Sequence, residues 1–164
     1  MKKILIPTDF SGKSLDILTD YLLSSNENKV SVLFFSVVKL SDSITDLLLL
    51  SKRTKEIELI PKSFENYCNC IQNEFERIED VRFEYFYGNT IALFRNFLDA
   101  NCIDEIVYDP AIKLQMVTRV SANPIEMIER CKWKKWIPSK KKADGKLTEE
   151  EKEIYAQEIE KAFL

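Results

Sequence analysis

The first residues that could take part in chemistry are Asp9 and its hydroxyl neighbours Thr8 and Ser11, which follow a largely apolar run at residues 3–7. A short apolar run that ends in turn residues and leads at once into a helical pattern is typical of a buried parallel strand. Ligands of open α/β sheets bind at the carboxyl ends of such strands. We therefore expect Asp9 to lie at the mouth of a potential site.

Other classes of chemistry are excluded or weakly supported. The chain contains no histidine, which removes Ser-His and Cys-His nucleophiles and every zinc site that contains histidine. Cys68 and Cys70 fall two positions apart in a predicted helix and so face different ways; we expect the four cysteines to be buried, reduced thiols. Asp9 and Asp109 could converge at the sheet edge and bind Mg²⁺, but only a fold argument supports this. We assign no catalytic residue and no metal site, and we do not expect an enzyme.

The elements that would position these residues alternate along the chain. Apolar runs predict strands at residues 3–7, 30–38, 81–87, 103–109 and 133–138, and helical periodicity predicts helices at about 12–25, 61–79, 90–98 and 124–131. Ser11 or Gly12, Asn89 and Asn123 are the expected caps of three of these helices. Such alternation predicts an α/β fold, a three-layer doubly wound sandwich with a parallel five-stranded sheet.

Two segments stand apart from this pattern. Residues 40–60 combine a short helix, capped by Asp42 or Ser43 and running through 47–50, with a weak edge-strand pattern at 56–60. A segment that covers the sheet is the favoured interpretation, and a lid or a partner surface is the alternative. Beyond residue 138, a basic linker leads to a capping box, Thr148 to Glu151, and a charged C-terminal helix. We therefore divide the chain into an α/β domain at 1–138 and a linker with helix at 139–164.

The C-terminal region is the best candidate for an interaction surface. Trp133 and Trp136 lie within a basic stretch at residues 130–146, a pattern that fits either nucleic-acid binding or a solvated linker. The acidic helix that follows can neutralise this stretch, so we favour the linker and do not expect nucleic acid. The residues assigned to an interaction surface are the two tryptophans and the apolar stripe of the final helix: Trp133, Trp136, Ile154, Tyr155, Ile159 and Phe163.

From composition we expect a cytoplasmic protein. The net charge is −3, and no segment approaches the roughly 20 apolar residues of a membrane span, so we expect no membrane partner. The apolar run after Met1 stops at Pro7, too short for the h-region of a signal peptide.

From residue 2 to about 138, the chain resembles the universal stress protein family. The opening strand Lys3-Ile4-Leu5-Ile6-Pro7-Thr8-Asp9, the Gly88-Asn89 turn and the strand Asp104-Glu105-Ile106-Val107-Tyr108-Asp109 resemble family motifs in order and spacing. The resemblance implies the fold that this family shares with adenine nucleotide alpha hydrolases. It also implies a homodimer, to which the fifth strand often contributes.

The glycine motif of the ATP-binding members is missing at unchanged length. Those members carry Gly-x-x-Gly, nine residues and then Gly-Ser or Gly-Thr after the fourth strand, and the positions fall here on Asp109, Ile112, Ala122 and Asn123. Glycines let backbone N–H groups approach phosphates, whereas a carboxylate repels them. By resemblance, Asp9 lies near a nucleotide and Val38 near an adenine. An ordinary capping role is the alternative for Asp9.

Two functions follow. The first is a regulatory or interaction protein of this fold that forms a homodimer, has an unidentified protein partner and needs no cofactor. The alternative is a small-ligand module that binds an adenine nucleotide or nucleoside through Asp9, Val38 and Asp109.

Overall fold

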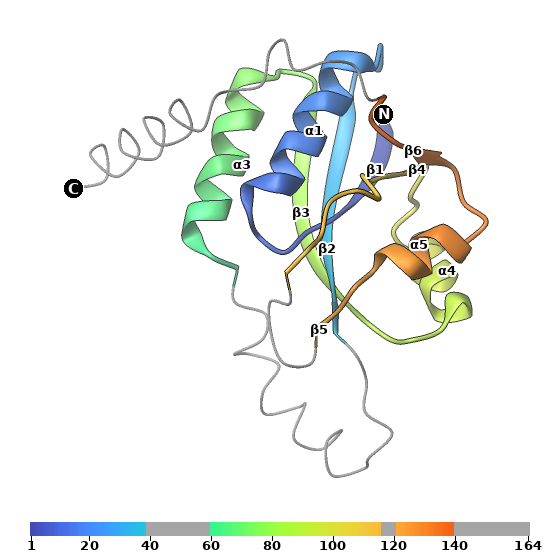
Figure 1. Cartoon of the computed structure of the whole chain (residues 1–164). Coiled ribbons are helices and arrows are strands. Elements are labelled where there is room, and N and C mark those ends of the chain that lie inside the picture. Colours follow the sequence, from blue (N-terminus) through green and yellow to red (C-terminus); the bar gives the residue numbers. More distant parts are fainter. Residues whose placement is uncertain (39–59, 116–120, 140–164) are drawn as a thin grey trace.

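The computed structural model describes residues 1–38, 60–115 and 121–139 (Figure 1). The strands are β1 (Lys2–Pro7), β2 (Val30–Val38), β3 (Ile78–Tyr87), β4 (Glu105–Val107), β5 (Ser121–Ala122) and β6 (Lys135–Trp136). The helices are α1 (Gly12–Ser24), α3 (Lys62–Glu74), α4 (Ile91–Ala100) and α5 (Ile125–Arg130). The predictions for residues 40–59, and for the linker and helix after residue 139 with Ile154, Tyr155, Ile159 and Phe163, lie outside the described residues.

The strand order β3-β2-β1-β4-β6 confirms the predicted doubly wound sheet. These five strands pair in parallel, with Ile6 beside Phe34, Leu5 beside Ile106 and Ile106 beside Lys135. A feature that the sequence analysis did not predict is β5, which pairs antiparallel with the end of β2. The strand order reverses between β1 and β4, which makes their carboxyl ends the switch point of the sheet.

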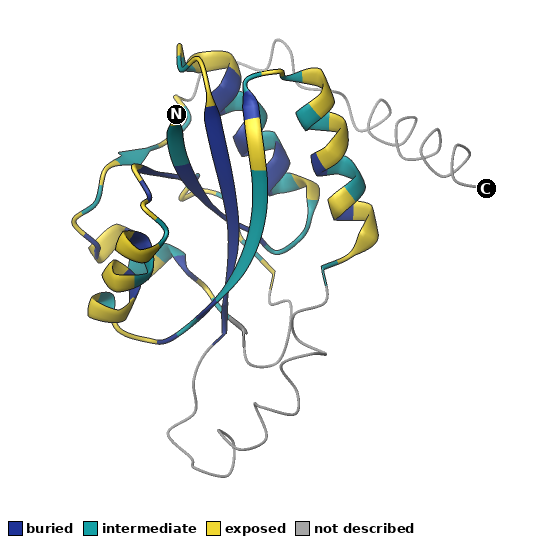
Figure 2. Cartoon of the chain, turned by 180° about the vertical axis from the view of Figure 1, so that it is seen from behind, coloured by how far each residue is buried: buried dark blue, intermediate teal, exposed yellow. Residues whose placement is uncertain are grey.

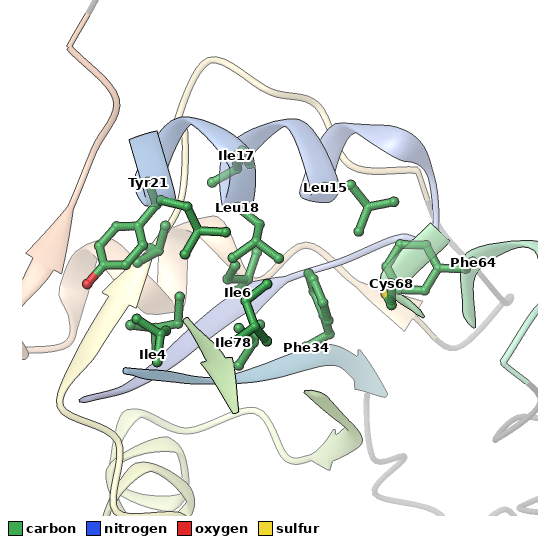
Figure 3. Packing of buried hydrophobic residues seen from close by; sticks show 14 residues of the cluster. Ile4, Ile6, Leu15, Ile17, Leu18, Tyr21, Phe34, Phe64, Cys68 and Ile78 are labelled. Atoms are coloured by element: carbon green, nitrogen blue, oxygen red, sulfur yellow. The ribbon is translucent and has the colours of Figure 1, made fainter. Parts of the chain in front are cut away.

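Two cores lie on opposite faces of this sheet because successive strand residues point to opposite sides. Ile4 and Ile6 face α1 and α3, in a cluster that Figure 3 shows from close by. Leu5 faces the other way, where it joins Phe94 of α4 and Ile128 of α5. Figure 2 shows the central strands as the buried layer between the helices. This confirms the predicted three-layer sandwich.

Several predicted boundaries were wrong. The helix predicted to reach Glu79 ends at Glu74, since Arg77 and Ile78 already belong to the β2–β3 pairing: the Arg77 carbonyl accepts from the Val30 N–H. Thr90, not Asn89, caps α4, and its hydroxyl accepts from the Leu93 N–H at 3.2 Å. The strand predicted at 103–109 is regular only at Glu105–Val107.

The cysteine prediction was half right. All four thiols are free, but only Cys68 and Cys131 are buried, whereas Cys70 and Cys102 are exposed. Cys70 lies on the outer side of α3, and Cys102 lies in the turn after α4. Within the described part of the chain, none of the helices has the length and apolar character of a membrane span.

Candidate functional site

The switch point of the sheet contains a small pocket. Its volume is about 50 Å³, and it is lined by residues from the ends of β1 and β2, the loop after β4, and the β5–α5 segment: Thr8, Ser36, Val37, Leu114, Gln115, Ala122, Asn123 and Pro124. Pockets that bury drug-sized ligands measure roughly 300–1,000 Å³. This pocket has room for a few water molecules and is too small for a nucleotide in this conformation.

The turn after β1 is a tightly bonded unit. The Thr8 N–H donates to the Phe35 carbonyl at 2.9 Å and continues the sheet by one step. The Thr8 hydroxyl accepts from the Phe10 N–H at 2.9 Å and shares a hydrogen bond of 2.8 Å with Ser14 of α1. Phe10 has a φ of 60°, a left-handed conformation that is rare for a bulky residue, and its ring lies 5.5 Å from that of Phe64. The strained residue is held by packing against α3.

Asp9 joins this turn to the loop that follows β4. Its Oδ1 accepts from both the backbone N–H and the hydroxyl of Ser11, and its Oδ2 accepts from the Gln115 N–H at 2.8 Å. Ser11 is the residue that caps α1. The capping role predicted for Asp9 was therefore wrong in detail, since the carboxylate supports the cap from two residues upstream.

The ionisation of Asp9 follows from these contacts. Partial burial acts to raise its pKa, but the hydrogen bonds from Ser11 and Gln115 and the positive charge of Lys13 outweigh burial and lower the pKa. The carboxylate is charged at neutral pH, and both of its oxygens accept hydrogen bonds from the chain itself.

The loop after β4 is also bonded internally. Asp109 Oδ1 accepts from the Ala111 N–H at 2.8 Å, and the Asp109 carbonyl accepts from the Ile112 N–H at 3.2 Å. The Ile112 side chain packs on the α1/α3 core. Lys13 Nζ donates to the Lys113 carbonyl at 3.0 Å and holds the loop against the start of α1. The amides of residues 111, 112 and 115 are thus satisfied by aspartate oxygens.

Val38 is enclosed by strand pairing. It is fully buried and lies beside Tyr87 on one side and Ser121 on the other. The edge of β2 at Val38 that faces away from β1 is paired with β3. β5 therefore pairs with the other edge of β2, just beyond Pro7, where β1 ends. Part of the chain itself therefore covers the strand ends at which an adenine was predicted to lie.

The structure places the two tryptophans on opposite faces of the sheet. Trp133 is half-buried on the α4/α5 side, and its indole N–H donates to the Ile103 carbonyl at 3.0 Å. Trp136 is half-buried on the α1 side, where its ring meets Tyr21 edge-on at 5.2 Å. Each tryptophan packs on one of the two cores and holds β6 against the sheet. The two side chains therefore do not form a common exposed pair.

The sequence analysis missed a buried charge cluster at the opposite end of the sheet. Glu105 of β4 is buried and lies 2.8 Å from Lys2 Nζ and 3.4 Å from Lys134 Nζ. The Tyr21 hydroxyl donates to it at 3.3 Å. The sequence signal that could have revealed this cluster was the carboxylate of Glu105 within the strand predicted at residues 103–109. Among the described residues, no group of three or more His, Cys, Asp or Glu side chains could hold a metal ion.

Comparison with known proteins adds evidence on the fold. No family model and no curated protein sequence matches the chain. Among solved structures, the universal stress protein UspA from Lactobacillus plantarum is 11% identical over 84% of this chain and 97% of its own, with a TM-score of 0.50.

Two further structures are similar over nearly their whole length. The hypothetical protein MJ0577 is 19% identical over 87% of this chain and 98% of its own, with a TM-score of 0.49. A universal stress protein in complex with cAMP is 15% identical over 85% and 98%, with a TM-score of 0.47. The likeness to UspA, together with the strand order described above, shows that this chain has the universal stress protein fold.

Proposed function

We propose that this chain is a universal stress protein-like regulatory or interaction protein that forms a homodimer and does not bind ATP through a glycine loop. It acts by binding protein rather than by catalysis. The observation that carries the proposal is the hydrogen bonding at the switch point of the sheet. There, oxygens of Asp9 and Asp109 accept the hydrogen bonds of the backbone amides at residues 111, 112 and 115.

Electrostatics supports the same conclusion. An anion-binding loop offers free N–H groups to a phosphate, whereas these amides already have carboxylate or carbonyl acceptors. The two carboxylates, of Asp9 and Asp109, would also repel a triphosphate, by about 1–4 kcal/mol per like-charge pair at close range, depending on the effective dielectric. Among the described residues, β5 lies beyond the end of β1, and the pocket at this place has a volume of about 50 Å³.

The direct test is calorimetric titration of the full chain with ATP, AMP and adenosine in the presence of Mg²⁺, paired with extraction of small molecules from denatured protein. We expect no heat of binding and no extracted nucleotide. Micromolar binding of ATP would overturn the proposal. Binding of AMP or adenosine alone would favour the alternative, an adenine-ligand module that opens the pocket at Thr8 and Ser36.

The variant Asp9→Ala separates a structural carboxylate from a ligand-binding one. In the structural role, we expect the free energy of unfolding at neutral pH to fall by about 1 kcal/mol, the usual cost of a lost cap. The pKa of Asp9 is lowered in the fold, so its contribution is complete above the ordinary value of 3.8 and is lost as the pH falls through the folded value. Urea unfolding should therefore show a difference from the parent at pH 7 that shrinks at about pH 3.

Asp20→Ala is the matched control, since it removes a carboxylate from the same helix outside this turn. It should lower the free energy of unfolding by no more than about 0.5 kcal/mol. An Asp9→Ala variant with unchanged stability but weaker nucleotide binding would contradict the structural role.

A further inference from the structure

The stretch around β6 combines an exposed apolar side chain with a group of cations. Ile137, directly after β6, is one of four large apolar side chains that are exposed among the described residues, and its exposed fraction is 46%. Trp133 is half-buried on the α4/α5 core. Residues 130–135 contain no carboxylate and four cations: Arg130, Lys132, Lys134 and Lys135. Apolar surface and an excess of positive charge therefore lie together where the chain leaves the sheet.

Two of these cations can still reach a further partner. Lys134 and Lys135 already bond within the domain. Arg130 lies 3.5 Å from Glu126 in a pair whose side chains are both strongly exposed, and such pairs contribute little. Lys132 is exposed, and the described residues supply it with no ion pair. The exposed positive and apolar side chains of this stretch, which we call the β6 surface, are Arg130, Lys132, Trp133 and Ile137.

The sequence that follows has the complementary pattern. Residues 147–164, which we call the terminal segment, contain six glutamates and two lysines, and their capping box predicts a helix. In a helix, residues three and four positions apart share a face. That spacing puts Glu151 and Glu158 beside the apolar stripe of Tyr155 and Ile159. One face of the predicted helix thus combines carboxylates with apolar side chains.

Chain length keeps the terminal segment close to this surface. The described part of the chain ends at Ser139, two residues after Ile137. The nine steps from Ser139 to Thr148 span at most about 30 Å when fully extended. A short tether of this kind gives the attached segment an effective concentration on the order of millimolar at nearby surfaces. Even a weak attraction then suffices for binding within the chain.

Charge selects the β6 surface among the faces within reach. Carboxylates outnumber cations on α1 and on α3, and the two balance on α4. An acidic segment is repelled or left indifferent by these helices, whereas residues 130–135 attract it. The β6 surface also offers the exposed apolar contact of Ile137.

We propose that the terminal segment binds to the β6 surface of its own chain through its apolar stripe, with Glu151 and Glu158 facing the two reachable cations. The side chains of the stripe cover Trp133 and Ile137. This inference goes beyond the proposed function, and it uses neither the homodimer nor the missing glycine loop.

Hydrogen exchange of the full chain, read by mass spectrometry, measures this binding. We expect the amides of residues 152–163 to exchange at least about tenfold more slowly than those of a synthetic peptide of residues 147–164, since an isolated helix of that length is marginal in water. Salt at 1 M should reduce the protection, because it shortens the Debye length to about 3 Å.

Charge reversal on both sides tests the pairing. Glu151→Lys/Glu158→Lys should lower the protection of the terminal segment by about tenfold or more, because attraction becomes repulsion. Arg130→Glu/Lys132→Glu should have the same effect from the side of the domain. The variant with all four substitutions should recover the protection.

Glu153→Lys/Glu160→Lys is the matched control. It changes the charge of the terminal segment by the same amount, but on the opposite face of the predicted helix. It should keep most of the protection. Equal losses in this variant and in Glu151→Lys/Glu158→Lys would show that net charge rather than one face is responsible, and would overturn the proposal.

The remaining outcomes identify a different occupant of the β6 surface. Protection that falls when the full chain is diluted would place the terminal segment on a second copy and overturn binding within the chain. Exchange as fast as in the free peptide would overturn it as well and leave the surface to another protein. Protection that is independent of concentration, with recovery in the fourfold variant, supports the proposal. None of these results depends on the nucleotide titration, so failure of this inference is distinct from failure of the proposed function.

Discussion

Cys102 closes α4 in a conformation that normally belongs to glycine. Its φ is 53°, its N–H donates to the Asp99 carbonyl at 3.0 Å, and the next N–H, of Ile103, donates to Leu98 at 3.0 Å. These two bonds form a Schellman motif, with the side chains of Leu98 and Ile103 together in the core. The thiol is exposed, so its packing contributes little to offset the backbone strain.

We therefore expect Cys102→Gly to stabilise the protein. A left-handed conformation costs an L-residue about 1–2 kcal/mol, and the greater freedom of glycine in the unfolded chain offsets about half of this gain. Urea unfolding should show a rise in the free energy of unfolding of about 0.5–1 kcal/mol. Cys102→Ala keeps the strain and should show no gain; an equal gain in both variants would contradict the explanation.

At the scale of elements, Arg77 connects the start of β3 to the end of α1. The helix ends at Ser24, and the capping residue that follows, Ser25, is extended and is not a glycine. The guanidinium of Arg77 donates to the carbonyls of Leu22, Ser25 and Glu27. A cation that bonds several carbonyls at a helix C-terminus is also favoured by the helix dipole.

Arg77→Ala should lower the free energy of unfolding by about 2 kcal/mol, because a charged donor to buried or half-buried carbonyls contributes about 1.5–3 kcal/mol. The measurement is urea unfolding followed by circular dichroism. Arg95→Ala, on the exposed side of α4, removes the same charge and should change the stability by less than about 0.5 kcal/mol. Equal losses in the two variants would show that charge alone, rather than the carbonyl contacts, is responsible.

At the scale of the whole molecule, several buried groups make the fold sensitive to alkali. Burial raises the pKa of the Cys68 thiol from 9.0 to about 12 and that of the Tyr21 hydroxyl from 10.0 to about 12. Burial acts to lower the pKa of Lys2, but its hydrogen bonds to Glu105 and Glu27 outweigh burial and raise it. In each case the folded protein retains a proton that the unfolded chain releases.

The stability from these groups is complete below the unfolded pKa values and is lost as the pH rises toward the folded ones. We expect the urea midpoint to fall steadily from about pH 9 upward. Cys68→Ala should make this fall shallower, whatever its effect at neutral pH, since one titrating group is gone. Cys70→Ala, on the exposed side of the same helix, should leave the slope unchanged, and parallel slopes for both variants would contradict the account.

Much of the fold could be predicted because local patterns agree with the final structure. The largely apolar runs at 3–7 and 30–38 predicted buried parallel strands, and the spacing of Phe64 and Cys68 predicted the buried side of α3. The predicted end of α3 was wrong because residues 75–79 carry a helical pattern that sheet pairing overrides. A two-residue strand such as β5 has no local signal at all.

The sequence by itself determined the order of the elements, the face that each one buries, and the loss of the glycines after β4. Those properties depend on side-chain type and on the periods of helix and strand, which are local. Only the tertiary structure decided what replaces the glycines: the oxygens of Asp9 and Asp109 satisfy the loop amides, and β5 covers the end of β1. The bond between Asp9 and Gln115 joins residues 106 positions apart. Pairings of that kind arise only after the sheet has brought the strand ends together, and they determine the geometry of the site.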